Sequence, residues 1–422
     1  MRKMRDSGID WVGAIPNHWR VSKIKQIVRW KSVKGQPDLP VLSLYRDYGV
    51  IPKDSRDDNH NVTSLDTSGY KVVEHGDLVI NKMKAWQGSL AVSEYNGIVS
   101  PAYHICKITS ENICKKYLHY LLRDASYLPE YMRLSTGLRV GQWDLSFDDF
   151  KNIPFLVPPL AEQERIAALL DAECAEIDAV LEKTRASIEE YKKLKQAVIT
   201  QAVTKGIRGD RPMKDSGIEW IGEIPAEWGV VPHKRIMHKV KEICEQYNGE
   251  DIISLTVNGV VKRDLTAGGK MPTSFDGYQY VEPNDLLLCL FDIDVTPRCV
   301  GVVRDYGVTS PAYSRFVMHD GYYNAYYDYL LRMIDDNKVF VHLSKNLRSS
   351  LTESDFGAIK TCAPPLAEQK CIAAFLDVRC DEIDALIAKK QQYLTEIENY
   401  KKSLIYEYVT GKKEVKTSVL AD

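Results

Sequence analysis

Two short segments in the first half of this 422-residue chain carry side chains suited to contacting nucleic acid. Arginine and glutamine can each make paired hydrogen bonds to a base edge, and lysine can hold a backbone phosphate. One segment directly follows an expected strand, and the other follows a glycine turn at position 137. The tryptophans in these segments could equally be core aromatics. The candidate DNA-binding residues are Lys82, Lys84, Trp86, Gln87, Arg139, Gln142 and Trp143.

The second half of the chain carries polar and basic residues in comparable places. Taken singly, each candidate in either half is better explained by an ordinary solvated surface position. Two clusters placed alike in two copies of one scaffold are better explained by a shared DNA-facing role. The candidates in this half are Lys262, Arg263, Arg298, Lys345, Asn346 and Arg348.

The sequence lacks the common signatures of catalysis. It contains neither a phosphate-cradling Gly-x-x-x-x-Gly-Lys-Ser/Thr loop nor a dinucleotide-binding Gly-x-Gly-x-x-Gly motif. The nine histidines show no metal-ligand spacing, and the nine cysteines include no Cys-x-x-Cys pair. The Pro-Pro-Leu segments lack the residues of an amino-methyltransferase loop. We therefore expect a non-enzyme with reduced thiols and with no catalytic residues, metal or cofactor of its own.

Composition limits the class of protein further. The chain is 44% hydrophobic and 27% charged, as soluble globular proteins are, and its length allows two or three domains. No apolar run reaches membrane-spanning length, and the N-terminus leads into polar sequence without a signal peptide. A net charge of −2 excludes a uniformly basic surface but permits a local basic face. These features predict a cytoplasmic protein with no membrane contact.

The candidate residues lie on a scaffold that the chain contains twice. Residues 6–16 (Asp-Ser-Gly-Ile-Asp-Trp-Val-Gly-Ala-Ile-Pro) return as residues 215–225, at an offset of 209. Ser-Pro-Ala-Tyr occurs at 100–103 and again at 310–313. This spacing far exceeds that of solenoid repeats, so it indicates a duplicated domain-plus-helix unit. The tryptophans expected to pin the two lead-ins against their modules are Trp11, Trp19, Trp220 and Trp228.

Between these landmarks the two copies diverge, and each is expected to be a mixed α/β module. Residues 81–89 (Asn-Lys-Met-Lys-Ala-Trp-Gln-Gly-Ser) correspond to residues 289–297 (Cys-Leu-Phe-Asp-Ile-Asp-Val-Thr-Pro). A shared scaffold with different inserted chemistry suggests two modules that perform one task on two different targets. Strands are expected at 41–45, 78–80, 90–92, 252–255, 286–290 and 300–303, and helices at 117–131 and 323–334.

Each module leads into a Pro-Pro-Leu-Ala-Glu-Gln motif, at residues 158–163 and 364–369. The prolines fix the chain before a helix, and glutamates in the first turn interact favourably with the helix dipole. The first copy then continues without glycine or proline to about Val203, roughly 44 residues or about 66 Å. Apolar residues recur every seven positions in both copies, as in a coiled coil, although a buried bundle helix is an alternative. The half-chain between the two helices allows them to run antiparallel.

These motifs together resemble the DNA-specificity subunit of Type I restriction-modification systems. The resemblance rests on the lead-in, on the Gly-Asp-Leu-Val-Ile-Asn-Lys-Met-Lys-Ala-Trp-Gln-Gly run that ends at Gly88, on Ser-Pro-Ala-Tyr and on Pro-Pro-Leu-Ala-Glu-Gln. It covers essentially the whole chain, although the second module departs from the Lys-Met-Lys-Ala-Trp-Gln-Gly run. It implies a non-catalytic protein whose two target-recognition domains each recognise one half of a bipartite double-stranded DNA sequence.

The resemblance also implies an α+β fold in which two long helices form an antiparallel coiled coil, with a pseudo-twofold internal duplication. This coiled coil would act as a spacer and dock two modification subunits, which bind S-adenosylmethionine and methylate adenine. Restriction subunits would supply the motor and nuclease. The expected boundaries are target-recognition domains at 1–157 and 207–363, helices at 158–206 and 364–412, and a tail at 413–422. The helix positions expected to carry docking are Leu170, Ile177, Leu181, Ile188, Leu376, Ile383, Ile387 and Leu394.

Two functions of other classes compete with this interpretation. A coiled-coil adaptor that binds no DNA would need no pair of divergent faces at equivalent places in the two copies. A fused methyltransferase or nuclease is opposed by the missing motifs. The sequence therefore favours a DNA-recognition subunit over both.

Overall fold

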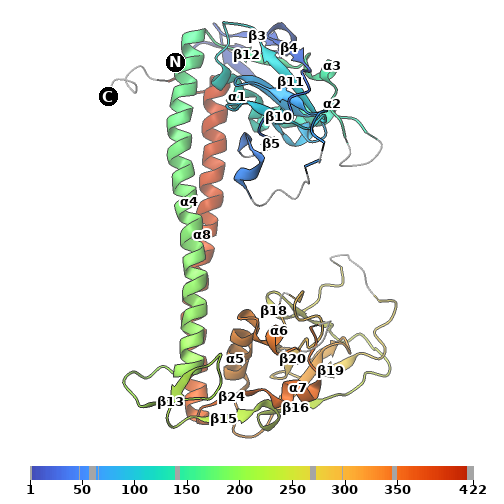
Figure 1. Ribbon diagram of the computed structural model, residues 1–422, viewed down its shortest axis with the longest axis vertical. Helices are drawn as coiled ribbons and strands as arrows, with labels where there is room; N and C mark the ends of the chain where they lie inside the picture. The colour runs from blue at the N-terminus through green and yellow to red at the C-terminus, as the bar shows by residue number, and fades with distance from the viewer. Residues whose placement is uncertain are drawn as a thin grey trace. The chain divides into compact units, whose positions relative to one another are not determined.

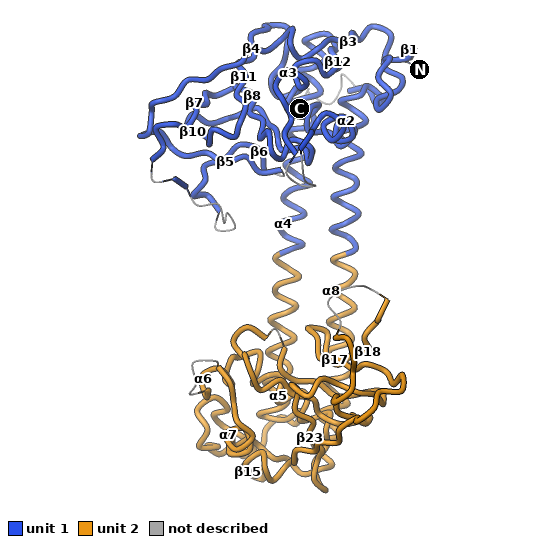
Figure 2. Tube along the Cα trace, turned by 90° about the vertical axis from the view of Figure 1, so that its right-hand side faces the viewer, with its two compact units in different colours: residues 1–185, 392–422 blue, residues 186–391 orange. Residues whose placement is uncertain are grey.

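The computed structural model describes residues 2–46, 48–56, 63–64, 66–137, 143–266, 272–296, 298–344 and 349–415. The chain forms two compact units, one of residues 1–185 with 392–422 and the other of residues 186–391 (Figure 2). Each unit contains one module of the duplicated sequence and part of each long helix. The fold is mixed α and β with an internal duplication, as the sequence predicts. The long helices are shared between the two units and do not form a separate domain.

The centre of the first unit is an antiparallel sheet of four strands, in the order β4 (Val28–Lys31), β11 (Tyr103–Ile108), β8 (Asp77–Asn81) and β9 (Leu90–Val92). Strand β8 is buried on both faces, because Leu78 and Ile80 lie in one apolar cluster and Val79 lies in another. Its three central residues, Leu78 to Ile80, are therefore all apolar, where a half-exposed strand would alternate. The other strands pair as β1 (Met4–Asp6) with β2 (Ala14–Pro16), β3 (Arg20–Lys23) with β12 (Pro154–Val157), β5 (Leu42–Tyr45) with β6 (Gly49–Pro52), and β7 (Lys71–Val73) with β10 (Gly97–Val99).

The helix expected at 117–131 is divided in the structure. Helix α1 (Lys115–Arg123) ends at Asp124, whose backbone is extended and whose carboxylate accepts a hydrogen bond from the Ser126 amide at 2.9 Å. An aspartate that bonds to a nearby backbone N–H competes with helix continuation, so the prediction of one continuous helix is wrong. The remaining helical segments of this unit are η1 (Ile24–Gln26), η2 (Lys53–Ser55), η3 (Ala85–Gln87), η4 (Ala125–Tyr127), α2 (Leu128–Leu134) and α3 (Phe147–Phe150).

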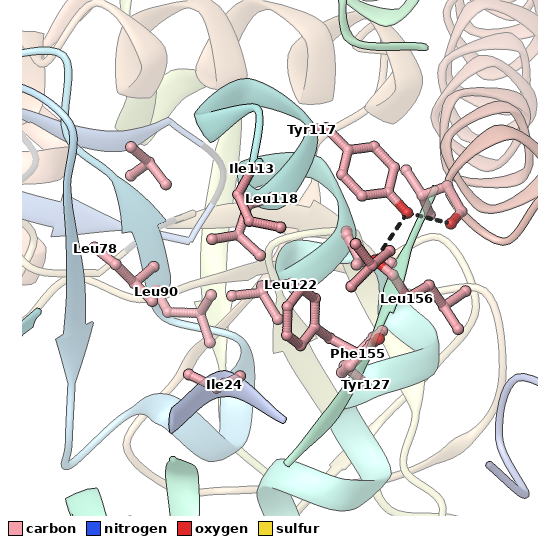
Figure 3. Close-up of a cluster of buried hydrophobic side chains, with 14 of the residues drawn as sticks. Ile24, Leu78, Leu90, Ile113, Tyr117, Leu118, Leu122, Tyr127, Phe155 and Leu156 are labelled. Carbon is pink, nitrogen blue, oxygen red and sulfur yellow. Dashed lines mark hydrogen bonds between the residues drawn. The ribbon is translucent and has the colours of Figure 1, made fainter. Parts of the chain in front are cut away.

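A large apolar core joins the sheet of the first unit to its helices (Figure 3). Burying a side chain such as Leu122 or Phe155 stabilises the fold by about 1.5–3 kcal/mol. Tyr117 is fully buried in this core, and its hydroxyl donates to the Val409 carbonyl at 3.1 Å. Val409 is the last residue of the second long helix, α8 (Leu366–Val409), where carbonyls lack partners within the helix. The module therefore holds the end of a long helix through a buried tyrosine.

The second unit repeats this architecture. Its central sheet has the order β16 (Met237–Val240), β23 (Ser314–Met318), β20 (Leu286–Leu288) and β21 (Val300–Val302). Tyr326 takes the place of Tyr117, because its hydroxyl donates at 2.8 Å to the Val203 carbonyl near the end of the first long helix, α4 (Leu160–Lys205). The other elements are β13 (Met213–Asp215), β14 (Glu223–Pro225), β15 (Gly229–Pro232), η5 (His233–Arg235), β17 (Ile253–Thr256), β18 (Gly259–Lys262), β19 (Gln279–Val281), β22 (Gly307–Thr309), α5 (Asn324–Asp336), α6 (Val339–Leu343), α7 (Glu353–Ala358) and β24 (Lys360–Ala363).

The two long helices run antiparallel within each unit (Figure 1). In the first unit Arg185 of α4 pairs with Glu398 of α8 at 2.8 Å, and in the second Lys195 pairs with Asp384 at 2.5 Å. Residues later in α4 thus contact residues earlier in α8. The two helices therefore run in opposite directions, which confirms the predicted antiparallel arrangement. Exposed ion pairs of this kind contribute only about 0–1 kcal/mol each, so the buried apolar residues between the helices dominate their pairing. In the part of the chain that the structure describes, no helix is long and apolar enough to cross a membrane.

A buried glutamate joins each lead-in to the start of a long helix. Glu162 accepts a hydrogen bond from the indole N–H of Trp19 at 3.1 Å, and Glu368 accepts one from Trp228 at 2.9 Å. Both indoles are almost completely buried, which confirms the structural role predicted for these two tryptophans. The glutamate of each Pro-Pro-Leu-Ala-Glu-Gln motif therefore does more than complement the helix dipole, because it fixes the lead-in to the helix.

The adjacent glutamine completes the same joint. Gln163 accepts a hydrogen bond from the Cys114 amide at 2.9 Å and donates to the Pro158 carbonyl at 2.9 Å. Cys114 is the N-cap of α1, where backbone N–H groups lack partners within the helix. Gln369 makes the equivalent bond to the Tyr323 amide, at the N-cap of α5, with a length of 2.7 Å. One glutamine thus links the start of a module helix to the start of a long helix in each copy.

Charge at this joint makes stability depend on pH. Burial alone would raise the pKa of the Glu162 carboxyl, but hydrogen bonds from Arg2 and His18 outweigh burial and lower that pKa. A carboxyl whose folded pKa is depressed stabilises the fold above its unfolded pKa of about 4.3. That contribution is lost as the pH falls through the lower, folded pKa.

Replacing Glu162 by glutamine should lower the free energy of unfolding at pH 7 by about 1–3 kcal/mol, because Arg2 loses the nearer of its two carboxylate partners. The difference from the wild type should shrink as the pH falls below the unfolded pKa of about 4.3 and through the lowered folded pKa, where the wild-type carboxyl also becomes neutral. Urea unfolding at several pH values measures both effects. Glu164→Gln is the matched control, since Glu164 lies in the same helical turn but is exposed. Equal losses in the two variants would contradict a specific role for Glu162.

Candidate nucleic-acid interface

The two candidate segments of the first unit meet on one surface. The Leu145 amide donates to the Lys82 carbonyl at 3.0 Å, and the Lys82 ammonium lies 2.8 Å from a carboxylate oxygen of Asp144. The rings of Trp86 and Trp143 pack edge to face with their centroids 5.4 Å apart. The fold therefore joins the segments that the sequence singled out separately. We define the first contact patch as residues 82–87 and 143–145.

The first contact patch begins where strand β8 ends. The Asn81 side chain accepts a hydrogen bond from the Met83 amide at 3.2 Å, which turns the chain out of the sheet. The turn closes at Gly88, whose φ is +83°, and a Cβ atom there would lie 2.8 Å from Leu128. Glycine is therefore required at this position. Trp86 is half-buried, and its indole N–H donates to the Met83 carbonyl at 3.2 Å, so it is held at the edge of the patch.

Positive charge gathers around the first contact patch. Burial lowers the pKa of Lys71, and the nearby charges of Lys34 and Lys82 lower it further. The Lys71 ammonium donates to the carbonyls of Pro101 and Tyr103, at 2.9 and 2.6 Å, within the first Ser-Pro-Ala-Tyr motif. Lys71 is buried, so it can attract a polyanion such as DNA only at a distance, whereas Lys34 is exposed. Lys34 and Lys71 were not predicted from the sequence, because only the folded chain brings them to the patch.

Aromatic side chains extend the same surface. The Trp30 ring is 57% exposed and stacks on Phe147, with centroids 6.1 Å apart. His104 lies 6.1 Å from Phe147 by ring centroids, and its Nε2 atom is 3.3 Å from the Leu145 carbonyl. Burial lowers the pKa of His104, which favours the neutral imidazole. These residues lie beside the contact patch, although no sequence motif marks them.

The other residues predicted in the first unit have separate outcomes. Lys84 and Gln87 are exposed on the turn after β8, where they can contact a ligand. Lys82 is partly exposed and paired with Asp144, so a phosphate contact requires this ion pair to open or be shared. Arg139 and Gln142 lie outside the described residues, and their role stays a prediction.

The second unit builds an equivalent patch with different side chains. The Leu351 amide donates to the Leu290 carbonyl at 2.8 Å, at the positions that correspond to the amide–carbonyl bond of the first patch. The Ile293 amide also donates to the Ser349 carbonyl at 3.1 Å. The same two loops therefore meet in both units. We define the second contact patch as residues 290–296 and 349–351.

The residues predicted to bind DNA in the second unit are dispersed. Lys262 pairs with Asp251 at 2.6 Å, and the adjacent Arg263 is exposed. Both line an open groove of about 480 Å³ with Asp264 and Leu265. Three other predicted residues lie outside the described part of the chain, namely Lys345, Asn346 and Arg348.

Arg298 lies in a different environment from Arg263. It is half-buried, and its Nε atom donates to the Val300 carbonyl at 2.8 Å. It lines a polar cavity of about 620 Å³ together with Asp328 and Arg332 of helix α5. Burial lowers the pKa of the Arg298 guanidinium, and the neighbouring Arg332 lowers it further. Arg298 is therefore less accessible to DNA than an exposed arginine such as Arg263.

The helix positions predicted to dock partner subunits lie mainly in buried surface of the chain itself. In the first unit, Leu170 and Leu181 of α4 share an apolar cluster with Leu404 of α8. Surface used in this way is not available to another subunit, so any docking must use the outward helix faces. The buried positions are Leu170, Ile177, Leu181, Ile188, Leu376 and Ile383, and the half-buried ones are Ile387 and Leu394.

The outward faces of both long helices do carry apolar side chains. On α8, Leu386, Tyr393 and Tyr400 follow one another at seven-residue intervals and are 42–55% exposed. On α4, Val180 and Leu194 are separated by twice that interval and are 40% and 47% exposed. Residues seven apart lie on nearly the same face of a helix, so each helix carries an outer apolar stripe, which Ser187 interrupts on α4. The heptad pattern predicted the inner stripes, whereas these outer ones were not predicted from the sequence.

Little in the described residues suggests metal or thiol chemistry. All nine cysteines are free thiols, as the sequence predicts, and eight of them are buried or half-buried. Burial raises the pKa of the Cys106 thiol to about 12, which suppresses its nucleophilic thiolate form. Among residues with described positions, no three histidine, cysteine, aspartate or glutamate side chains converge as metal ligands would.

Comparison with known proteins finds similar proteins of one class. Residues 16–190 match the family described as the Type I restriction modification DNA specificity domain. The Type I restriction enzyme MjaVIII specificity subunit of Methanocaldococcus jannaschii is 24% identical over 430 residues, covering 95% of this chain and 94% of the relative. A second protein of that organism, named as the MjaX specificity subunit, is 24% identical over 434 residues and covers 96% of each chain.

One solved structure shares the fold across nearly the whole chain. It comes from work described as "Structural basis underlying complex assembly and conformational transition of the type I R-M system". Its TM-score is 0.69 at 14% identity, with 94% of this chain and 99% of that chain covered. The matched family and the named relatives together support the assignment of this chain to the DNA-specificity subunits of Type I restriction-modification systems. The family resemblance found in the sequence motifs is thereby confirmed.

The contact between Trp86 and Trp143 provides a test of whether the first contact patch is one surface. Trp86→Leu and Trp143→Leu should show a coupling energy of about 0.5–1.5 kcal/mol in a double-mutant cycle of unfolding free energies. The cycle Trp86→Leu with Trp220→Leu is the control, because Trp220 lies in the other unit. Additive losses for the first pair would contradict a shared patch.

Proposed function

We propose that this chain recognises a bipartite double-stranded DNA sequence, with one module for each half-site. The main support for this proposal is that an equivalent backbone hydrogen bond joins the same two loops in each unit, while the side chains on those loops differ. A shared loop framework with exchanged side chains is suited to one task on two targets. Lysine, glutamine and tryptophan in the first contact patch supply phosphate and base contacts.

The long helices act in this proposal as a spacer between the half-sites. Helix α4 has 46 residues and α8 has 44, which correspond to lengths of about 69 and 66 Å. One turn of DNA is about 34 Å, so helices of this length suit half-sites roughly one to one and a half turns apart. Bases between the half-sites would then stay unrecognised.

The outer apolar stripes support a scaffolding role for the same helices. One stripe on each helix, related by the internal duplication, fits two copies of one kind of partner. We assign these partners as modification subunits, which would bring S-adenosylmethionine and the adenine-methylating site, while restriction subunits would join for cleavage. This chain would itself be non-catalytic, in line with its family.

Methylome sequencing of DNA from cells that express this chain with its neighbouring modification subunit tests the proposal. The expected result is a split motif with methyladenine in both halves. A single uninterrupted motif would contradict the assignment of one half-site to each module. The absence of any motif, with both subunits expressed and assembled, would favour the adaptor function.

Arg139→Ala or Gln142→Ala should relax one half-site only, because both residues belong to the first module. Loss of a paired hydrogen bond to a base edge should reduce discrimination at one position by about 1–3 kcal/mol. Binding to duplexes with single base changes in each half-site measures this loss. Equal relaxation of both half-sites would contradict the proposed division between the modules.

Matched insertions of seven residues, after Ser187 in α4 and in the facing part of α8 near Leu394, should lengthen the spacer. Seven helical residues add about 10.5 Å, close to three base pairs at about 3.4 Å each. Both half-sites should keep their sequences, and the methylation motif reports both quantities. Substitution of seven existing surface residues without insertion is the control for helix disturbance. An unchanged spacer would contradict the ruler role of the helices.

A further inference from the structure

The second contact patch has a chemistry unlike that of the first. Val295 is 73% exposed, more than any other large hydrophobic side chain among the described residues, and Phe291 is 39% exposed. Asp292 and Asp294, which lie between them, are also exposed. The loop from 290 to 296 contains no lysine or arginine, whereas the corresponding loop of the first unit contains two lysines. An exposed valine beside two carboxylates is poorly suited to a phosphate backbone.

The loop is nevertheless well defined and holds these side chains outward. Ile293 is completely buried and anchors the middle of the loop in the apolar core of the unit. Both the amide and the hydroxyl of Thr296 donate to the Asp292 carbonyl, at 2.9 and 2.8 Å, which closes a turn. Asp294 and Val295 form the tip between the buried anchor and this closure. The tip is therefore presented to solvent at a fixed place on the second contact patch.

We propose that Asp294 and Val295 recognise base edges in the major groove of the second half-site. This assignment rests on the proposed bipartite DNA recognition. A carboxylate only accepts hydrogen bonds and is repelled by phosphates, so it gains on DNA only where a base offers an amino group. Valine supplies an apolar contact of the kind that the thymine methyl group accepts. The loop thus selects base edges that a lysine-bearing loop would not.

Cytosine is the base that fits the carboxylate best. In the major groove cytosine presents only its N4 amino donor, whereas adenine presents an acceptor beside its amino group and guanine presents two acceptors. Acceptors next to a carboxylate repel it, because neither side supplies a proton. We therefore assign the second half-site a cytosine opposite Asp294 and an adjacent thymine opposite Val295.

The test uses the full chain expressed with its modification subunit and the methylation motif as readout. Asp294→Asn adds donors to the side chain, so the position that requires cytosine should also accept adenine, with discrimination reduced about 5- to 150-fold. Val295→Ala should relax the adjacent thymine position by a smaller factor. The first half-site should stay unchanged in both variants, which also shows that the complex is assembled.

Asp320→Asn is the matched control, because Asp320 is exposed in the same unit but lies beside the joint of α5 with α8. An unchanged second half-site in both variants overturns the assignment of Asp294 and Val295. Loss of methylation at both half-sites would place these residues in folding or assembly, and it would also overturn the assignment. A wild-type chain that yields no split motif would instead refute the bipartite recognition on which the inference rests.

Discussion

The structure depends on how each module is fixed to the pair of long helices. Glu162 and Glu368 accept hydrogen bonds from the indole N–H groups of buried tryptophans, and buried tyrosines donate to carbonyls at the C-terminal helix ends. A buried carboxylate that lost these donors would keep its desolvation cost without compensation, so each joint holds only when all of its partners are in place. The Pro-Pro-Leu-Ala-Glu-Gln motif is therefore an attachment site as well as a helix start. Its two copies give the two modules the same attachment.

This division of roles explains where the two halves agree and where they differ. Residues at the joints are retained in both copies, since the geometry of a buried hydrogen bond tolerates little change. Solvent-facing loops carry no such constraint, and their side chains can be exchanged without loss of the core. A paired exchange illustrates this freedom: Trp30 stacks on Phe147 in the first unit, whereas the corresponding Lys239 and Glu353 lie 3.6 Å apart as an ion pair in the second. A contact is kept at this place although its chemistry is not.

Much of the architecture could be predicted because it is encoded in periodic or repeated sequence. The duplication, the long helices and the segment after β8 all have such signals. The break in the helix at Asp124 has no such signal, because it depends on whether the Asp124 carboxylate bonds to the backbone or to solvent. The same limit applies to Lys71, which reaches the first contact patch only through the pairing of distant strands. Heptad periodicity also revealed apolar helix positions without showing which of them face another part of the same chain.

The overall charge of the chain constrains how it can bind DNA. With a net charge of −2, long-range attraction to a polyanion is weak, and each phosphate contact must come from a local group such as the lysines around the first contact patch. The second contact patch has an acidic loop in the corresponding place, which lowers affinity for DNA in general. Such a loop can favour a correct sequence only through the contrast between matched and mismatched base edges. The two modules would then divide the work, with non-specific attraction mainly from the first and discrimination more strongly from the second.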